Sequence, residues 1–299
     1  MESIATGWFA QVAATAFGLA VGSFANVVIY RSPRDGLSSF RPARSFCPHC
    51  NAPVRWHDNI PVLSWIALSG RCRSCRQPIS PRYLVVELLV AALFLAAVVL
   101  WPPVDSDSMV RLGVAFYLAT VCVIVTLVDF EHLIIPDSIT WPGMVLGLLA
   151  SLAFPVLHAT HRGFHADQPH ASSLIASVFG MVAGGGSLMV VGAIGNRLMK
   201  RKLQEAGVPD SMGWGDVKWM ALAGTFLGVD SVLSAILIGC FAGAVVGIAL
   251  KVVARVRREE SPIGVPFGPF LSLGILAELV SPGLAFTLLA SLARASAPA

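Results

Sequence analysis

The sequence predicts an all-α polytopic membrane protein with about eight transmembrane helices and a cytoplasmic, zinc-ribbon-like insert. Hydrophobic residues make up 56% of the 299 positions and charged residues only 13%, and the mean hydropathy is +0.74. A soluble domain carries about 25% charged residues. The second observation is a series of apolar segments near the ~20 residues that a spanning helix needs. The third is a pair of Cys-x-x-Cys motifs in one polar segment.

The apolar segments predict the spans one by one. The sixth of these segments is short, and Pro282-Gly283 interrupts the last, so the count is seven or eight. The predicted spans are 6–30, 83–101, 109–129, 136–157, 172–194, 216–229, 231–250 and 266–290.

Basic residues predict the orientation of these spans. Nine arginines lie in 31–82, and four basic residues follow in each of the segments 194–214 and 251–258, whereas the opposite loops hold three. The positive-inside rule places the richer loops in the cytoplasm. Because no basic residue precedes the first span, we expect that helix to be retained, with its N-terminus outside.

The same pattern predicts the division of the chain. Residues 1–30 form the first transmembrane helix, 31–82 the cytoplasmic insert, and 83–299 the membrane core. The net charge of +4 comes from the inside loops, and no basic face for nucleic acid is built. Anionic lipid headgroups are the expected partners of the arginines in the insert.

Two Cys-x-x-Cys knuckles in the insert predict a metal site. Their spacing is close to that of a zinc ribbon, in which four thiolates hold a tetrahedral ion. Disulfides are disfavoured in a reducing compartment, and four free thiols remain the other reading. A closed four-sulfur site would fold the insert rather than catalyse. The predicted ligands are Cys47, Cys50, Cys72 and Cys75.

Two aspartates are the candidate catalytic residues. Asp129 closes the apolar run Val-Thr-Leu-Val-Asp, and Asp216 opens another in Gly-Trp-Gly-Asp-Val-Lys. A carboxylate at membrane depth is expensive and by default points to function. The predicted topology puts both at the cytoplasmic face. Gly213 and Gly215 leave room for a close backbone approach beside Asp216.

For the other acidic residues a structural role explains the position without catalysis. Asp137 follows a proline and is expected in the first turn of a helix, where an acid is favoured. Glu131 is expected near solvent. Glu87 and Glu278 lie within predicted helices, where they can pair with polar neighbours. The glycines of Gly184-Gly-Gly-Ser lie mid-helix without a preceding strand, which argues against a nucleotide loop.

Together these motifs resemble the prepilin peptidase family, the type IV leader peptidases, which are membrane aspartyl proteases of the GxGD type. The resemblance covers nearly the whole chain. It runs through Gly22-Ser-Phe-Ala-Asn-Val-Val, both knuckles with Asp58-Asn-Ile-Pro-Val-Leu-Ser-Trp between them, Ile79-Ser-Pro-Arg-Tyr-Leu-Val-Val-Glu, Asp129-Phe-Glu-His-Leu-Ile-Ile-Pro-Asp, Gly213-Trp-Gly-Asp-Val-Lys and Pro266-Phe-Gly-Pro-Phe.

The resemblance implies an enzyme of the bacterial inner membrane with its active site at the cytoplasmic face. It would cut the leader from type IV prepilins or from pseudopilins of type II secretion, and then N-methylate the new terminus with S-adenosylmethionine. The family's catalytic aspartates match Asp129 and Asp216. Its metal-binding cysteines match the four above, a tetrad associated with the bifunctional members. One departure is Glu131, where many relatives carry Asp.

Two other interpretations remain open. A transporter with a zinc-stabilised insert could use the aspartates in a proton path, and it would predict paired hydropathy repeats, which the sequence does not display. A GxGD peptidase without methyltransferase activity would share every motif around the aspartates.

Overall fold

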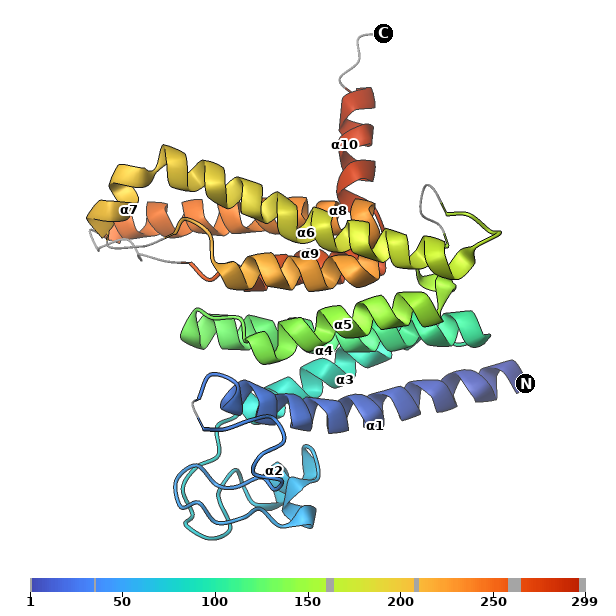
Figure 1. Ribbon diagram of the computed structural model, residues 1–299. Helices are drawn as coiled ribbons and strands as arrows, with labels where there is room; N and C mark the ends of the chain where they lie inside the picture. Colours follow the sequence, from blue (N-terminus) through green and yellow to red (C-terminus); the bar gives the residue numbers. More distant parts are fainter. Residues whose placement is uncertain (1, 35, 160–163, 207–209, 258–264, 296–299) are drawn as a thin grey trace. The chain divides into compact units, whose positions relative to one another are not determined.

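The computed structural model describes all residues except 1, 35, 160–163, 207–209, 258–264 and 296–299 (Figure 1). The described residues form helices and hold no strand, as the sequence predicts. They divide into two compact units, Met1–Leu127 and Val128–Ala299, and each unit is described by itself. The three-part division at residues 30 and 82 stays a prediction.

The first unit is built on two helices, α1 and α3, that approach closely at glycines of α1. Adding a Cβ to Gly18 or Gly22 of α1 would bring it within 2.7 Å of the Cα of Ala91 or Glu87 on α3. The absence of side chains lets the two backbones touch. The elements of this unit are α1 (Glu2–Arg31), η1 (Trp56–Asn59), α2 (Leu63–Ala67), α3 (Arg82–Leu100) and the greater part of α4 (Ser106–His132).

The second unit packs its helices around a long, broken α8. The backbone of α8 leaves the helical region at Gly228, with φ 74° and ψ −176°, so that two helices meet there. Glycine adopts this positive φ without a steric penalty. The other elements are α5 (Asp137–Ala153), η2 (Pro155–Leu157), α6 (Pro169–Leu198), α7 (Lys200–Ala206), α8 (Trp214–Arg257), α9 (Gly268–Val280) and α10 (Leu284–Ala295).

Six of the eight predicted spans fall on one helix or on part of one, whereas 136–157 covers α5 and η2, and 266–290 covers α9 and part of α10. Among the described residues, five helices are long and apolar enough to cross a membrane: α1, α3, α4, α6 and α8. The pair α9 and α10, bent by 81°, would make a sixth. The predicted sixth and seventh spans share α8, on either side of Gly228, and α5 has only 17 residues. Large apolar side chains such as Phe179 and Val182 point outward, as lipid-facing residues do.

Glycines also set the contact between α6 and α8. A Cβ on Gly180 would collide with the carbonyl oxygen of Gly224, and one on Gly184 with that of Met220. Gly184 and Gly185 therefore serve helix packing rather than a nucleotide loop. Beside this contact Ser177 Oγ donates to the carbonyl of Thr225 at 2.7 Å. Hydrogen bonds of this kind join helices where lipid offers no partner.

Glu278 on α9 explains the break in the last predicted span. Its side chain is 2% exposed and accepts the backbone N–H of Gly283 at 2.6 Å and that of Leu284 at 3.2 Å. Ser234 Oγ on α8 donates to it as well. The first N–H groups of a helix lack intrahelical partners, so this carboxylate satisfies the start of α10, which turns away from α9 in Figure 1.

We expect Gly180→Ala to destabilise the second unit by about 1–3 kcal/mol, because an added methyl group must separate α6 from α8. The control is Gly186→Ala on the same helix, where a Cβ would meet only Val182 Cγ1, at 4.0 Å. Thermal unfolding of the two variants in detergent measures the difference. Equal melting temperatures of the two variants would contradict the close contact between α6 and α8 at Gly180.

Candidate active site and metal centre

Asp129 lies in the last turn of α4, held by a residue distant in sequence. Its side chain is 6% exposed, and its Oδ2 accepts the backbone N–H of Gly268, the first residue of α9, at 2.8 Å. A Cβ on Gly268 would lie 2.8 Å from the same oxygen. Glycine is thus the residue that lets this N–H reach the carboxylate.

Asp216 lies in the first turn of α8, beside the loop that leaves α4. A Cβ on Gly215 would lie 2.9 Å from Ile135 Cβ and 3.2 Å from Ile135 N. Gly215 therefore permits the close approach that the sequence predicts for it. Gly213 faces Asp216 itself, since a Cβ there would lie 3.1 Å from Asp216 Oδ2.

The structure brings the two candidate carboxylates together within the second unit. Asp216 lies within electrostatic range of Asp129, although α5, α6 and α7 separate them in sequence. The contact of Gly215 with Ile135 and the bond from Gly268 supply this geometry. Two carboxylates that influence each other electrostatically in apolar surroundings favour sharing one proton. The pair can therefore offer one acid and one base.

Asp137 and Glu131 take the places expected of them. Asp137 begins α5 and forms an ion pair with Lys218 of α8, which joins the starts of the two helices. Glu131 is exposed, with an oxygen 3.9 Å from His132 Nε2. The pairing of Lys218 with Asp137 was not anticipated from the sequence, because nothing local signals it.

The two knuckles of the insert have the same backbone conformation. In the first, the Cys47 N–H donates to Ala52 O at 3.0 Å, and in the second the Cys72 N–H donates to Gln77 O at 2.9 Å. Each knuckle ends with a residue of left-handed conformation, Asn51 at φ 56° and Arg76 at φ 61°. Isolated β-bridges close both turns. The repeated turn presents two sulfurs from each knuckle to one centre.

The four cysteine sulfurs fit a tetrahedral ion. They all lie within 4.8 Å of one another, and Cys47 Sγ is 3.8 Å from Cys75 Sγ. Zinc–sulfur bonds of about 2.3 Å place tetrahedral sulfurs about 3.8 Å apart. All four predicted ligands are therefore gathered, and the distances suit zinc better than either paired disulfides or scattered thiols.

The protonation of the thiols points the same way. Backbone N–H groups, that of Cys75 first, lower the pKa of the Cys72 thiol to about 7. At Cys75 the N–H of Gln77 also favours the thiolate, but burial and the three other thiols prevail and raise its pKa to about 12. One thiolate therefore forms more readily than the other, and a bound cation would favour the thiolate form of all four cysteines.

An ion pair ties the second knuckle to η1. The Arg73 guanidinium donates two hydrogen bonds to Asp58, at 2.7 and 2.6 Å, and this holds the pKa of Asp58 below its usual value. The pair fixes the loop between the knuckles against the cysteine cluster.

Sequence reasoning missed Gly268 as a partner of Asp129. The motif Pro266-Phe-Gly-Pro-Phe is visible in the sequence, and its small residue between two prolines marks the start of a helix. The contact itself spans 139 positions, and no local pattern reports a contact at that separation.

Comparison with known proteins identifies the family. The model for the bacterial peptidase A24 N-terminal domain matches residues 16–101, and that for the type IV leader peptidase family matches residues 116–248. A "Prepilin leader peptidase/N-methyltransferase" of Myxococcus xanthus (strain DK1622) is 36% identical over 276 residues, covering 89% of this chain and 71% of that protein.

Two further relatives align along nearly their whole length. A protein of the same name from Aeromonas hydrophila is 34% identical, covering 86% of each chain. The "Type 4 prepilin-like proteins leader peptide-processing enzyme" of Escherichia coli O78:H11 (strain H10407 / ETEC) is 32% identical, covering 90% of this chain and 93% of its own. No solved structure matches the chain. With both family models and these relatives in agreement, the chain belongs to the type IV leader peptidase family.

Proposed function

We propose that this chain is a membrane aspartyl endopeptidase that removes the leader peptide from type IV prepilins or type II secretion pseudopilins, and then N-methylates the new terminus. The observation that carries the peptidase half is the convergence of two carboxylates, Asp129 and Asp216, at helix ends of the second unit. The names of the relatives support both halves.

The two aspartates hydrolyse the scissile amide as an acid–base pair. One carboxylate removes a proton from water, which attacks the carbonyl carbon, while the protonated partner donates a hydrogen bond to the carbonyl oxygen. They titrate as a coupled pair. Gly268 orients Asp129 through Oδ2, which directs the other oxygen of this carboxylate to the water or the shared proton.

The substrate is a transmembrane helix with a basic leader, and it reaches the aspartates from the lipid. The positive-inside rule places Asp129 and Asp216 at the cytoplasmic face of the inner membrane. Anionic headgroups neutralise the arginines of the insert, which would otherwise repel the leader.

The methyltransferase half needs a donor and a neutral amine. When bound, S-adenosylmethionine supplies an activated methyl group. This group would be transferred to the new terminal amine of the cleaved substrate. The insert carries Cys47, Cys50, Cys72 and Cys75, which would hold zinc in a closed structural site.

We expect Asp129→Asn and Asp216→Asn each to lower the cleavage rate by at least about 10²–10⁴-fold, because either change removes one member of the acid–base pair. Asp230→Asn, at an exposed position of α8, is the matched control and should cut normally. The measurement is prepilin cleavage by purified enzyme with a labelled methyl donor. A transporter would cut nothing, and a peptidase without methyltransferase activity would leave the product unlabelled.

Gly268→Ala should slow cleavage about 10²-fold, because the added methyl group would displace Asp129 from its N–H partner. Gly247→Ala on α8 is the control, since nothing lies within 4 Å of a Cβ there. The cleavage rates are compared only after the melting temperatures have shown that both variants are as stable as the wild type. Wild-type cleavage by the Gly268 variant would remove this glycine from the mechanism.

The purified protein should contain one zinc ion per chain by elemental analysis, and Cys72→Ser should lose it together with abundance or methylation. Removing one ligand opens the tetrahedral site and unfolds the insert that depends on it. Cys240→Ser, exposed on α8, is the control. A Cys72 variant with wild-type zinc content, abundance and both activities would contradict the zinc assignment.

A further inference from the structure

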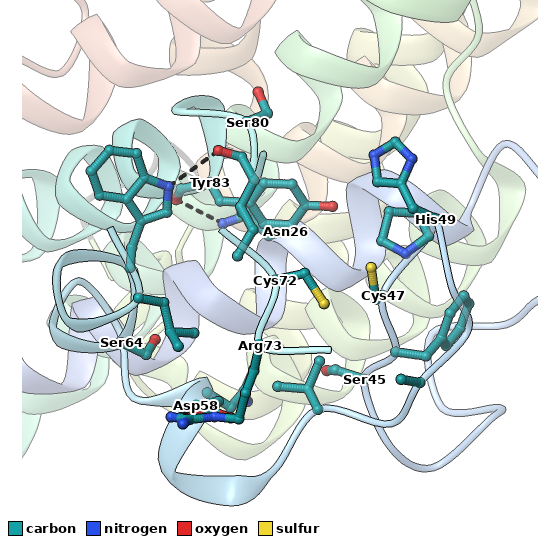
Figure 2. A pocket seen from close by; sticks show the side chains of 18 of the residues that line it. Asn26, Ser45, Cys47, His49, Asp58, Ser64, Cys72, Arg73, Ser80 and Tyr83 are labelled. Atoms are coloured by element: carbon teal, nitrogen blue, oxygen red, sulfur yellow. Dashed lines mark hydrogen bonds and ion pairs between the residues drawn. The ribbon is translucent and has the colours of Figure 1, made fainter. Parts of the chain in front are cut away.

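A cavity of about 470 Å³ lies within the first unit, between the insert and the ends of two helices. Its volume is in the range of ~300–1,000 Å³ that small-molecule sites occupy. Figure 2 shows Asn26 from α1 and Tyr83 from α3 on one side, with Cys47 and Cys72 of the knuckles nearby. Neither Asp129 nor Asp216 lines it, so the proposed peptidase chemistry gives it no role.

Asn26 presents an unused acceptor in this cavity. Its side chain is 2% exposed, and its Nδ2 donates to the carbonyl of Tyr83 at 2.9 Å. That bond fixes the amide orientation, since only the nitrogen can donate. Oδ1 is buried and has no hydrogen-bond partner among the described residues. A buried acceptor without a donor is costly, and a ligand N–H would satisfy it.

Glu87 presents a buried carboxyl group that pairs with no cation among the described residues. It is 8% exposed, its Oε2 accepts the N–H of Val62 at 2.8 Å, and the Ser23 side chain also hydrogen-bonds to it. In the described part of the chain no Lys or Arg acts on it. The cavity's other acid, Asp58, is already paired with Arg73. A cationic ligand is therefore the expected counter-charge of Glu87.

Aromatic rings supply flat walls. Tyr83 and Trp65 both line the cavity. The Trp65 Nε1–H donates to Ile79 O at 3.3 Å, and a Cβ on Gly70 would lie 2.8 Å from the indole ring. The indole is therefore held on two sides. Ring faces of this kind stack on nucleobases and attract cations.

We propose that this cavity binds the methyl donor, S-adenosylmethionine, with Glu87 opposite its sulfonium charge, Asn26 Oδ1 accepting an adenine N–H, and the Trp65 and Tyr83 rings beside the base. The residues fit the group in size and hydrogen bonding, and Arg31, Arg55 and Arg73 line the cavity together with Glu87 and Asp58. Cys47 and Cys72 line the same cavity, and four thiolates that held zinc there would add negative charge beside the sulfonium. This assignment rests on the proposed methyltransferase activity.

The test measures the binding of the methyl donor rather than the rate of methylation. Calorimetry on the detergent-solubilised full chain measures the affinities for S-adenosylmethionine and for its product, S-adenosylhomocysteine, whose sulfur is neutral. Glu87→Gln keeps the shape and an acceptor for Val62, so we expect it to weaken the donor about tenfold or more and the product less. Trp65→Leu should weaken both by similar factors. Asp107→Asn, exposed in the same unit, should change neither.

A second measurement keeps the assignment testable if a variant unfolds. Ultraviolet cross-linking of the labelled donor to the wild-type chain, followed by peptide mapping, should place the label within residues 23–87. Label found within residues 128–299 would overturn the assignment of the donor site to this cavity. Unchanged donor affinity in Glu87→Gln with weakened prepilin binding would instead make the cavity a leader-binding site, and would overturn it too.

The outcomes separate this inference from the proposed function. Asp129→Asn should stop cleavage and leave donor binding intact. If the wild-type chain binds neither donor nor product and methylates no cleaved prepilin, the methyltransferase half of the proposed function fails. If it methylates but the label maps elsewhere, only the cavity assignment fails.

Discussion

A carboxylate among apolar helices must find its hydrogen-bond donors inside the protein, and this constraint organises both units. Among the described residues, three buried acids accept backbone N–H groups: Asp129 from Gly268, Glu87 from Val62, and Glu278 from Gly283. Each donor lies where the chain begins a new helix, at α9, α2 or α10. Such N–H groups have no partner within their own helix. The breaks between helices thus make the interior acids tolerable.

The consequence for the candidate active site is that its geometry depends on loops as much as on spans. Asp129 is positioned by the start of α9, and Asp216 by the approach of Gly215 to Ile135. Both contacts require glycine, because a Cβ would occupy the space that the neighbour fills. The glycines and the aspartates therefore belong together, because the glycines set the backbone separation around both carboxylates.

Local sequence patterns predicted the structural features that depend on residues close together in the sequence. Hydropathy located the helices, Pro282-Gly283 marked the bend, and proline placed Asp137 at the start of α5. The spacing of the knuckles predicted the gathering of four sulfurs. What escaped prediction lies between distant segments. Gly268 with Asp129, Lys218 with Asp137, and the partners of Glu278 are pairings that no periodicity encodes. The cavity escaped for the same reason, since α1, the insert and α3 all contribute to its wall.

The paired knuckles have one more consequence. Each turn brings two sulfurs, so a tetrahedral ion would need both halves, and the segment that carries Asp58 and Trp65 lies between them. Metal loading would then act as a reversible cross-link that removes loop-closure entropy, as a disulfide does. The cell's supply of zinc would in this way set what fraction of the protein molecules has an ordered insert.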